Sequence, residues 1–459
     1  MRTLDQILTK KDYSRKTPAS LFYKDSPLWQ KLLAIGCVFF LSVAGLGEWK
    51  VLNGMLGGLP KAITLGVIGL AMLYTLFYPD EKRLREIWKP TLLYMSLMVA
   101  LFFWSMVIWI KNFATVSSMI RSCSKLVFQS IAILTAVALV YLFREKAIEL
   151  FTISICITNG AIMLLCIPDY GVAASIQSLV TCLVTFGEAV GYARQLEIHD
   201  LTFVFGQMIL YYAVFAPRTT RQEKRKRWLY LLACIWFFLV GMKRIAIPAV
   251  VLFILIALLL RKRKVPSWFY PAVGVCYILF FLVFLYGVRN GIVSRLLNSV
   301  GVDMMGRDYL WSMANPYYEF SITYLGHGFE YVDTIIGQWY SAGLINHPYP
   351  FHNDILKVFV EVGFPGFLLW SGIQYVLTPL FWQRYADQQT ALLYMCELGY
   401  MTVTYLTDNT AFYFWSTMAL RLVAFSYAME RKKPPEPKVW MPDSRQEMRD
   451  RIRILMKEV

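Results

Sequence analysis

Apolar residues fall into blocks of roughly 16 to 21 residues along most of the chain, and short charged stretches separate the blocks. A helix of that length, rising ~1.5 Å per residue, crosses the ~30 Å hydrocarbon core of a bilayer. The pattern predicts an all-α polytopic membrane protein with about twelve transmembrane helices, at residues 30–48, 60–79, 90–110, 126–143, 149–167, 200–216, 228–242, 245–260, 268–288, 355–380, 390–406 and 411–428.

The run 228–260 is apolar throughout except for Lys243 and Arg244. As one helix it would be about 50 Å long, and its two strongly basic flanks would lie on opposite sides of the membrane. Two short helices joined by a turn at Gly241–Arg244 place both flanks in the cytoplasm. Each leg is then only ~23 Å long, so we expect the turn to be recessed in the outer leaflet with two cations. Alternatively, both cations snorkel to water.

Composition agrees with a membrane protein, because 57% of the residues are hydrophobic and 17% are charged, against roughly 25% charged in an average soluble domain. The net charge of +16 lies mainly in the short links between apolar blocks. That is the positive-inside pattern, and it argues against a nucleic-acid partner. It predicts cytoplasmic termini (1–29 and 429–459), nine helices in 30–288, a large extracytoplasmic loop at 289–354 between helices nine and ten, and three helices in 355–428.

Two extracytoplasmic segments are long. Residues 168–199 are weakly amphipathic and are expected to lie along the membrane surface. Residues 309–351 of the large loop contain twelve aromatic residues. Aromatic rings suit the C–H faces of sugars, although anchoring at the membrane interface explains aromatics equally well. All four histidines fall outside in this topology, namely His199, His327, His347 and His352.

The motifs of the later half occur in a fixed order: KRIAIP (243–248), GRDYLW (306–311), YLGHGF (324–329) and PYPFHNDILKVFVEVGFPGFLLW (348–370). This order resembles the O-antigen ligase and O-antigen polymerase superfamily of bacterial glycan-assembly enzymes. The resembling features are Arg307, the Gly326–Gly328 turn, His352–Asn353, and Gly363 with Gly366. KRIAIP stands where the family has Ser-Arg, and Lys243 in place of Ser makes that match looser. The first 190 residues resemble the family only in hydropathy.

The resemblance implies a metal-independent, inverting membrane glycosyltransferase without a cofactor, in the bacterial cytoplasmic (inner) membrane. Such enzymes pass a glycan from a polyprenyl diphosphate to a hydroxyl acceptor outside the cytoplasm. The implied partners are a polyprenyl-diphosphate-linked oligosaccharide, membrane lipid, and flippase and chain-length regulator proteins. Nucleic acid is not among them.

The chemistry of such a transfer needs two kinds of side chain. A leaving diphosphate gathers negative charge, which arginine stabilises, and Arg307 and Arg244 are the candidates. The acceptor hydroxyl needs a base that titrates near neutral pH, and His352 is the candidate. Asp354 is a possible orienter or a rival base. The residues expected to contact substrate are Lys243, Asn353, Asp354, Tyr309, Trp311 and His347.

Several of these residues have a plainer interpretation. Asn353 or Asp354 precedes an apolar run and could simply cap a helix. His347, His352 and Asp354 fit no strong metal-binding pattern, so no metal is expected. His327 between glycines is interpreted as a turn residue. Two further pairs are expected to be ionic: Lys357 with Glu361 on a surface, unless they contact substrate, and Glu397 with Arg421 within the membrane, between the last two helices.

A polysaccharide polymerase is the function that this reasoning favours. A ligase of the same superfamily is the alternative, and a transporter or flippase with twelve helices is another. Against a transporter, the two halves show no repeated hydropathy pattern, and the large loop is placed asymmetrically. A scaffold subunit would not need the arginine and histidine residues.

Overall fold

The computed structural model describes residues 28–185, 189–301, 304 and 306–431, and within these ranges the chain is helical, with no strand. The expected cytoplasmic tail lies outside the described residues, apart from its first three positions, and so does nearly all of the N-terminal segment. The long helices are α2 (Leu28–Leu46), α4 (Leu65–Phe77), α5 (Glu81–Lys111), α6 (Val116–Phe143), α7 (Ala147–Tyr170), α10 (His199–Leu210), α11 (Arg221–Val240), α12 (Ala246–Leu260), α13 (Phe269–Arg289), α17 (Asp354–Ser371), α19 (Gln388–Thr407) and α20 (Phe414–Arg431).

Shorter helices connect these: α3 (Lys50–Leu56), α8 (Val172–Thr185), α9 (Tyr192–Gln195), α14 (Ile292–Ser299), α15 (Arg307–Ala314), α16 (Tyr331–Ser341) and α18 (Thr378–Tyr385). Single turns of 3₁₀ helix lie at Leu59–Thr64, Arg144–Lys146, Asn315–Tyr317 and Thr410–Phe412, and π-helical turns lie at Tyr211–Phe215 and Gly372–Leu377.

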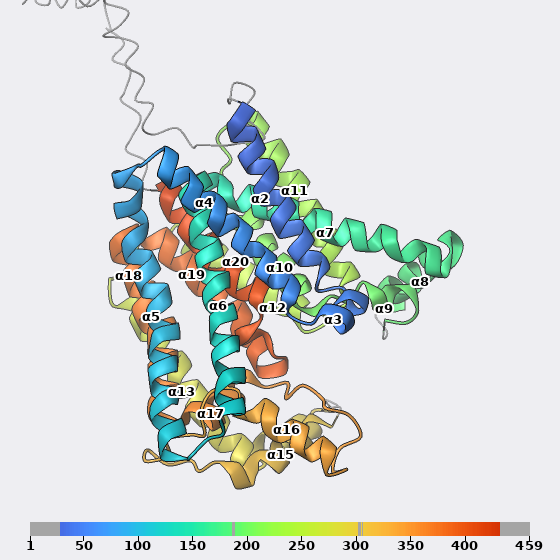
Figure 1. The fold of residues 1–459 in the computed structure, drawn as a ribbon, viewed down its shortest axis with the longest axis vertical. Coiled ribbons are helices and arrows are strands. Elements are labelled where there is room, and N and C mark those ends of the chain that lie inside the picture. Colours follow the sequence, from blue (N-terminus) through green and yellow to red (C-terminus); the bar gives the residue numbers. More distant parts are fainter. Residues whose placement is uncertain (1–27, 186–188, 302–303, 305, 432–459) are drawn as a thin grey trace, which may run out of the picture.

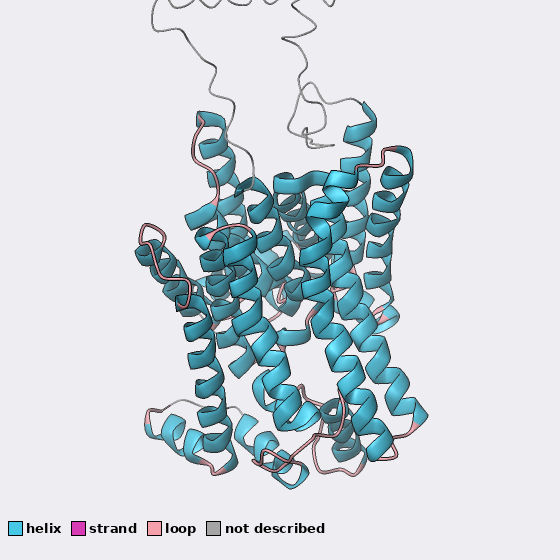
Figure 2. Ribbon diagram, turned by 90° about the vertical axis from the view of Figure 1, so that its left-hand side faces the viewer, coloured by secondary structure: helices cyan, strands magenta, loops and turns pink. Residues whose placement is uncertain are grey.

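The helices form a bundle, and one end of it carries the loop that contains α15 and α16 (Figure 1). Helices α5, α6, α13 and α17 reach this end, whereas α7 and α8 project from the side of the bundle (Figures 1 and 2). The core lies around α20, which packs against α6, α10 and α19. Large aromatic side chains fill it, and Trp370, Trp382 and Trp415 are among those fully buried.

Six helical stretches are long and apolar enough to cross a membrane. They are Leu28–Leu46, Leu59–Phe77, Glu81–Lys111, Val116–Tyr170, Phe269–Arg289 and Asp354–Tyr385. Each of the twelve expected blocks is occupied by helix, but α10, α11, α12, α19 and α20 are not among these six, and α12 is apolar but shorter. Many positions of α10, α19 and α20 face protein rather than lipid, so these helices tolerate more polar residues. The count of twelve spans stays a prediction.

The expected helical hairpin at 228–260 is confirmed. α11 begins with a capping box, in which Thr220 and Glu223 each satisfy the other's backbone N–H group, and it ends at Val240. α12 begins at Ala246, after a turn in which Met242 has φ 54°. The depth of this turn in the membrane remains a prediction.

Several boundaries differ from the sequence prediction, and α5, α6 and α11 begin seven to ten residues earlier than expected. α6 begins at Val116 rather than near 126, because Thr115 caps it by accepting a hydrogen bond from Ser118 N. Arg121 and Lys125 therefore belong to a helix and not to a link. The expected surface segment 168–199 contains the end of α7, then α8 and α9. Side chains spaced four residues apart on α8 are exposed and apolar, namely Val172, Ile176, Val180 and Val184.

α17 is broken at Gly363, which has φ 65° and ψ −172°, a conformation that only glycine adopts readily. Pro365 follows and has no N–H group to donate to the carbonyl of Glu361, four residues before it. That carbonyl instead accepts hydrogen bonds from His327 N (3.0 Å) and Gly328 N (2.7 Å). The YLGHGF turn thus supplies the donors that the broken helix lacks.

The expected ion pair between Glu397 and Arg421 is not present. Arg421 Nη2 donates to Gln374 Oε1 at 3.3 Å, and Arg421 Nη1 donates to Thr417 O at 3.5 Å. Both carboxylate oxygens of Glu397 are buried without a hydrogen-bond partner among the described residues. Equal depth in adjacent helices was the basis of the prediction, but it does not determine the side of the helix on which each residue lies.

Candidate active site

The FHND segment is fixed by contacts at the start of α17. Asn353 caps the helix by accepting a hydrogen bond from Leu356 N at 3.0 Å. Asp354 is 1% exposed, and its Oδ2 accepts a hydrogen bond from Ala411 N at 2.7 Å. These contacts tie the start of α17 to the turn between α19 and α20. Both residues therefore hold the segment in place, as their capping interpretation anticipated.

His352 is held in an unusual backbone conformation, with φ 53°. Its backbone N donates to Asn409 Oδ1 at 2.8 Å, and its ring Nδ1 lies 3.6 Å from Asp408 Oδ1. The His352 side chain is 23% exposed and contributes to the wall of a cavity. An acidic partner on Nδ1 leaves Nε2 free to accept a proton and stabilises the imidazolium that results.

Asp408 lies in the α19–α20 turn and has a perturbed pKa. Burial alone would raise the pKa of its carboxyl group. The His352 ring beside it and the charges of Lys243 and His199 outweigh that effect, and they hold the pKa of Asp408 well below its usual range. Asp408 is therefore an anion at neutral pH, as an orienting group for histidine must be.

Lys243 lies next to this pair. Its Nζ is 3.0 Å from Glu197 Oε1, 3.8 Å from Asp408 Oδ2 and 3.4 Å from His199 Nε2. Lys243 thus lies between two carboxylates, Glu197 and Asp408, which compensate its charge. Lys243, His199, Asp408 and His352 thus form one connected chain of side chains, to which the α11–α12 turn contributes Lys243.

Arg307 and His352 line the same cavity, of about 510 Å³, which we call the Arg307 cavity. Arg307 is the first residue of α15, directly after Gly306 (φ 78°). Tyr309 also lines the cavity and is 55% exposed. The remaining walls are Gly306, Leu310, Leu344, Ile345, Asn346 and Tyr349. Among the described residues of this lining, Arg307 is the only Lys or Arg residue and there is no carboxylate, and much of the wall is apolar.

Two other expected substrate contacts lie outside the lining of this cavity. Trp311 is 4% exposed, and its Nε1 donates to Phe351 O at 3.3 Å, which fastens α15 to the FHND segment. His347 is exposed, and its ring lies 5.3 Å from that of Tyr349, which does line the cavity.

Arg244 is exposed beside Lys243, and its side chain has no ion pair with any residue in the described ranges. The two neighbours therefore differ: Lys243 is bound within the protein and Arg244 is free for a ligand. His327 is a turn residue as expected, because it lies between Gly326 and Gly328 and its ring stacks on Tyr331.

Lys357 and Glu361 are not on a surface, which corrects the sequence interpretation. Lys357 is 6% exposed and Glu361 is fully buried. Lys357 Nζ lies 2.7 Å from Asp333, 3.5 Å from Glu330 and 3.9 Å from Glu361. Glu361 Oε1 in turn accepts a hydrogen bond from Val332 N at the start of α16, at 3.2 Å. The cluster joins the loop helix α16 to α17.

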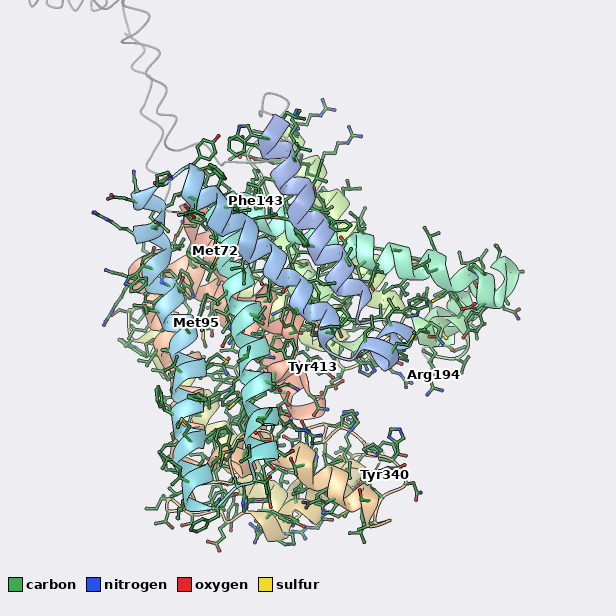
Figure 3. The ribbon with its side chains drawn as sticks, in the orientation of Figure 1. Met72, Met95, Phe143, Arg194, Tyr340 and Tyr413 are labelled. Atoms are coloured by element: carbon green, nitrogen blue, oxygen red, sulfur yellow. The ribbon has the colours of Figure 1, made fainter. Side chains whose placement is uncertain are left out.

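A second cavity, of about 770 Å³, lies beside α6 and α16, and we call it the α6 cavity. Figure 3 shows Tyr413, which lines this cavity, at about the level of Arg194 of α9 and above Tyr340 of α16. Its cationic side chains are Lys50, Lys61, Arg121 and Lys125, and its carboxylates are Glu48, Glu197, Asp200, Glu330 and Asp333. Its aromatic side chains are Phe128, Phe412, Tyr413 and Phe414.

Sequence reasoning missed Asp408, Asn409, Glu197 and His199 as parts of the site. Asp408 and Asn409 lie in the short link between the expected helices 390–406 and 411–428. A pair of polar residues in so short a link was the available signal, because the predicted topology puts this link on the same side as the large loop. Glu197 and His199 gave no comparable signal, since nothing in their spacing relates them to Lys243.

Residues 228–371 match the family model described as O-antigen ligase. The matched segment runs from the first half of α11 to the end of α17, so it includes Lys243, Arg244, Arg307 and His352 but not the Asp408 turn. A search of curated proteins finds no match.

Proposed function

We propose that the protein transfers glycan from a polyprenyl diphosphate to a sugar hydroxyl, starting from the match of residues 228–371 to the O-antigen ligase family model. The family match indicates a membrane enzyme of the O-antigen ligase type that processes glycans. The observation that supports the finer proposal is the shared cavity of Arg307 and His352. It brings together a cation for a leaving diphosphate and a base for an attacking hydroxyl.

The proposed step begins with the acceptor hydroxyl, which gives its proton to His352 as its oxygen attacks the anomeric carbon. The bond between that carbon and the diphosphate oxygen breaks, and the diphosphate leaves with the electron pair on its lipid carrier. Attack from the side opposite the leaving group inverts the anomeric centre. Arg307 stabilises the charge that develops on the diphosphate. Asp408 keeps His352 in the required tautomer and stabilises its protonated form.

Arg244 is a second candidate for the diphosphate, because it is exposed and unpaired within the described part of the chain. Tyr309 and Tyr349 offer ring faces to the sugar or to the first isoprene units. In this scheme, neither sugar binding nor departure of the diphosphate requires a nucleotide or a metal ion. We propose a growing polysaccharide as the acceptor, which makes the enzyme a polymerase. A ligase would differ in the acceptor and not in these residues.

The test is reconstitution of the purified protein with a polyprenyl-diphosphate oligosaccharide, without nucleotide or metal, scored for larger glycan. We expect His352→Ala to lower the rate by about 10²- to 10⁴-fold, the usual contribution of a positioned base. Arg307→Ala should lower it by about 10²- to 10³-fold, the usual contribution of one preorganised charge donor. Arg307→Lys should rescue poorly, because a point charge cannot grip a diphosphate in two places.

The matched control is Arg295→Ala, which removes an exposed arginine from α14 in the same loop. It should leave the rate unchanged. Retained activity in His352→Ala would disprove the base assignment. A strict need for a divalent ion would contradict the mechanism.

A further inference from the structure

The Arg307 cavity and the α6 cavity differ in charge and in the character of their walls. The part of the Arg307 cavity wall that the structure describes has one arginine, no carboxylate and several apolar side chains. The α6 cavity has four Lys or Arg side chains and five carboxylates, so its formal charges nearly cancel. An anionic ligand on an apolar carrier suits the Arg307 cavity, whereas the carboxylates of the α6 cavity would repel it.

The polar groups of the α6 cavity match a neutral, polyhydroxylated ligand. A sugar hydroxyl both donates and accepts hydrogen bonds, whereas a carboxylate only accepts and an ammonium or guanidinium group only donates. A wall that contains both carboxylates and cationic groups can therefore accept a hydrogen bond from each hydroxyl and donate one to it. Arg121 is exposed and has no ion pair with a described residue, and Asp333 is 38% exposed on its side chain. Phe128 and Tyr413 add ring faces.

Residues two positions apart in the FHND region line the two cavities. Pro350 lines the α6 cavity and His352 lines the Arg307 cavity, two residues further along the chain. His199 also lines the α6 cavity and is joined to His352 through Lys243 and Asp408. A glycan in the α6 cavity would thus have its end near the proposed base.

We propose that the α6 cavity binds the uncharged glycan chain that accepts the transferred unit, and that the Arg307 cavity binds the lipid diphosphate. This inference rests on the proposed glycosyl transfer. It adds a binding site built largely from the first half of the chain, outside the segment that matches the family model.

The test measures binding by protection of a single cysteine, so it does not depend on turnover. Ser124 is exposed on α6 and lines the α6 cavity, and Tyr309 lines the other cavity. Ser124→Cys and Tyr309→Cys are made separately, with the native Cys123, Cys156 and Cys276 replaced by Ser because they are at least partly exposed. The matched control is Ser117→Cys, exposed on the same helix and absent from the lining of either cavity.

The probes are the lipid-free repeat oligosaccharide of the host's own surface polysaccharide and a polyprenyl diphosphate without sugar. With the oligosaccharide at about ten times its dissociation constant, maleimide labelling at position 124 should slow about tenfold, because only the unoccupied fraction reacts. Labelling at positions 117 and 309 should not change. The polyprenyl diphosphate should slow labelling at 309 alone.

Three results would overturn the proposal: no protection at 124, protection by oligosaccharide at 309 instead, or protection at 124 by the diphosphate. Failure of the proposed function gives a different result, namely protection at 124 in a protein that forms no larger glycan in the reconstituted assay. Ser124→Trp adds an independent measurement, since filling the α6 cavity should raise the KM for acceptor and leave that for donor unchanged. An unchanged acceptor KM would count against the site.

Discussion

Replacing Gly363 by alanine should detach the YLGHGF turn from α17. Gly363 has φ 65° and ψ −172°, and a non-glycine residue in such a region costs about 1–3 kcal/mol. Its new Cβ would lie 2.5 Å from Gly326 N and closer still to the backbone of Tyr324 and Leu325. Because these atoms are backbone and not the ends of flexible side chains, the turn itself must move.

Moving the turn breaks the hydrogen bonds from His327 N and Gly328 N to Glu361 O, and from Phe364 N to Tyr324 O at 2.8 Å. Three such bonds contribute about 3 kcal/mol together, at ~1 kcal/mol each. With the backbone strain, the expected loss is about 4–6 kcal/mol for docking of the turn.

The assay is thermal unfolding of the detergent-solubilised protein together with the rate of proteolysis within residues 324–330. Gly363→Ala should lower the unfolding midpoint and speed cleavage. The control is Gly337→Ala in α16, where an added Cβ meets nothing within 4 Å. That change should be neutral or slightly stabilising, because alanine favours a helix more than glycine does. Equal midpoints and equal cleavage rates for Gly363→Ala and the wild type would refute the reasoning.

Four further outcomes are expected. Lys357→Met leaves the buried Glu361 without a cation and removes a cation from Glu330 and Asp333, which should destabilise the protein by about 3–5 kcal/mol in chemical unfolding. A loss under 1 kcal/mol would contradict the buried cluster. Asp200 accepts hydrogen bonds from Trp415 N (2.8 Å) and Ser416 N (2.9 Å) at the start of α20, so Asp200→Ala should lower stability by about 0.5–2 kcal/mol, and an unchanged midpoint would be inconsistent with this cap. The pKa of Asp408 is lower in the folded than in the unfolded protein, so ionised Asp408 stabilises the fold above the unfolded pKa of about 4, and this stabilisation is lost as the pH falls further. The unfolding midpoints of wild type and Asp408→Asn should therefore converge on acidification from pH ~5. A difference that stays constant with pH would argue against the contact with His352. To test the topology, a cysteine introduced near Tyr331 should react with an impermeant thiol reagent in intact cells, and one near Lys224 should not. The reverse labelling would mean that the protein has the opposite orientation in the membrane.

The sequence predicted the helices far better than it predicted the partners of polar side chains. Hydropathy locates helices because the bilayer requires long apolar blocks, and strongly basic flanks were enough to divide 228–260 into two helices. Pairing depends on helix rotation, which one sequence does not determine. Arg421 therefore contacts Gln374 and not Glu397, and Lys357 lies in a buried cluster and not on a surface.

In the candidate site, local motifs were likewise predicted better than contacts between distant segments. Arg307 and His352 were predicted from local motifs and do line one cavity. Asp408 and His199 were missed because they lie far away in sequence and reach the site only through the packing of α10, α19 and α20. The sequence suggested that Asn353 either contacts substrate or caps a helix, and the structure shows the helix cap.

Synthesis runs from the N-terminus, so the segment Tyr324–Gly328 leaves the ribosome before α17 does. The broken helix would otherwise enter the bilayer with the carbonyl of Glu361 unsatisfied, seven residues or about 10 Å into the span. Since its donors precede it in the chain, they can already be on the far side of the membrane when α17 inserts. A circular permutant that moved this turn behind α17 would reverse that order, and it should insert poorly even though its final contacts were the same.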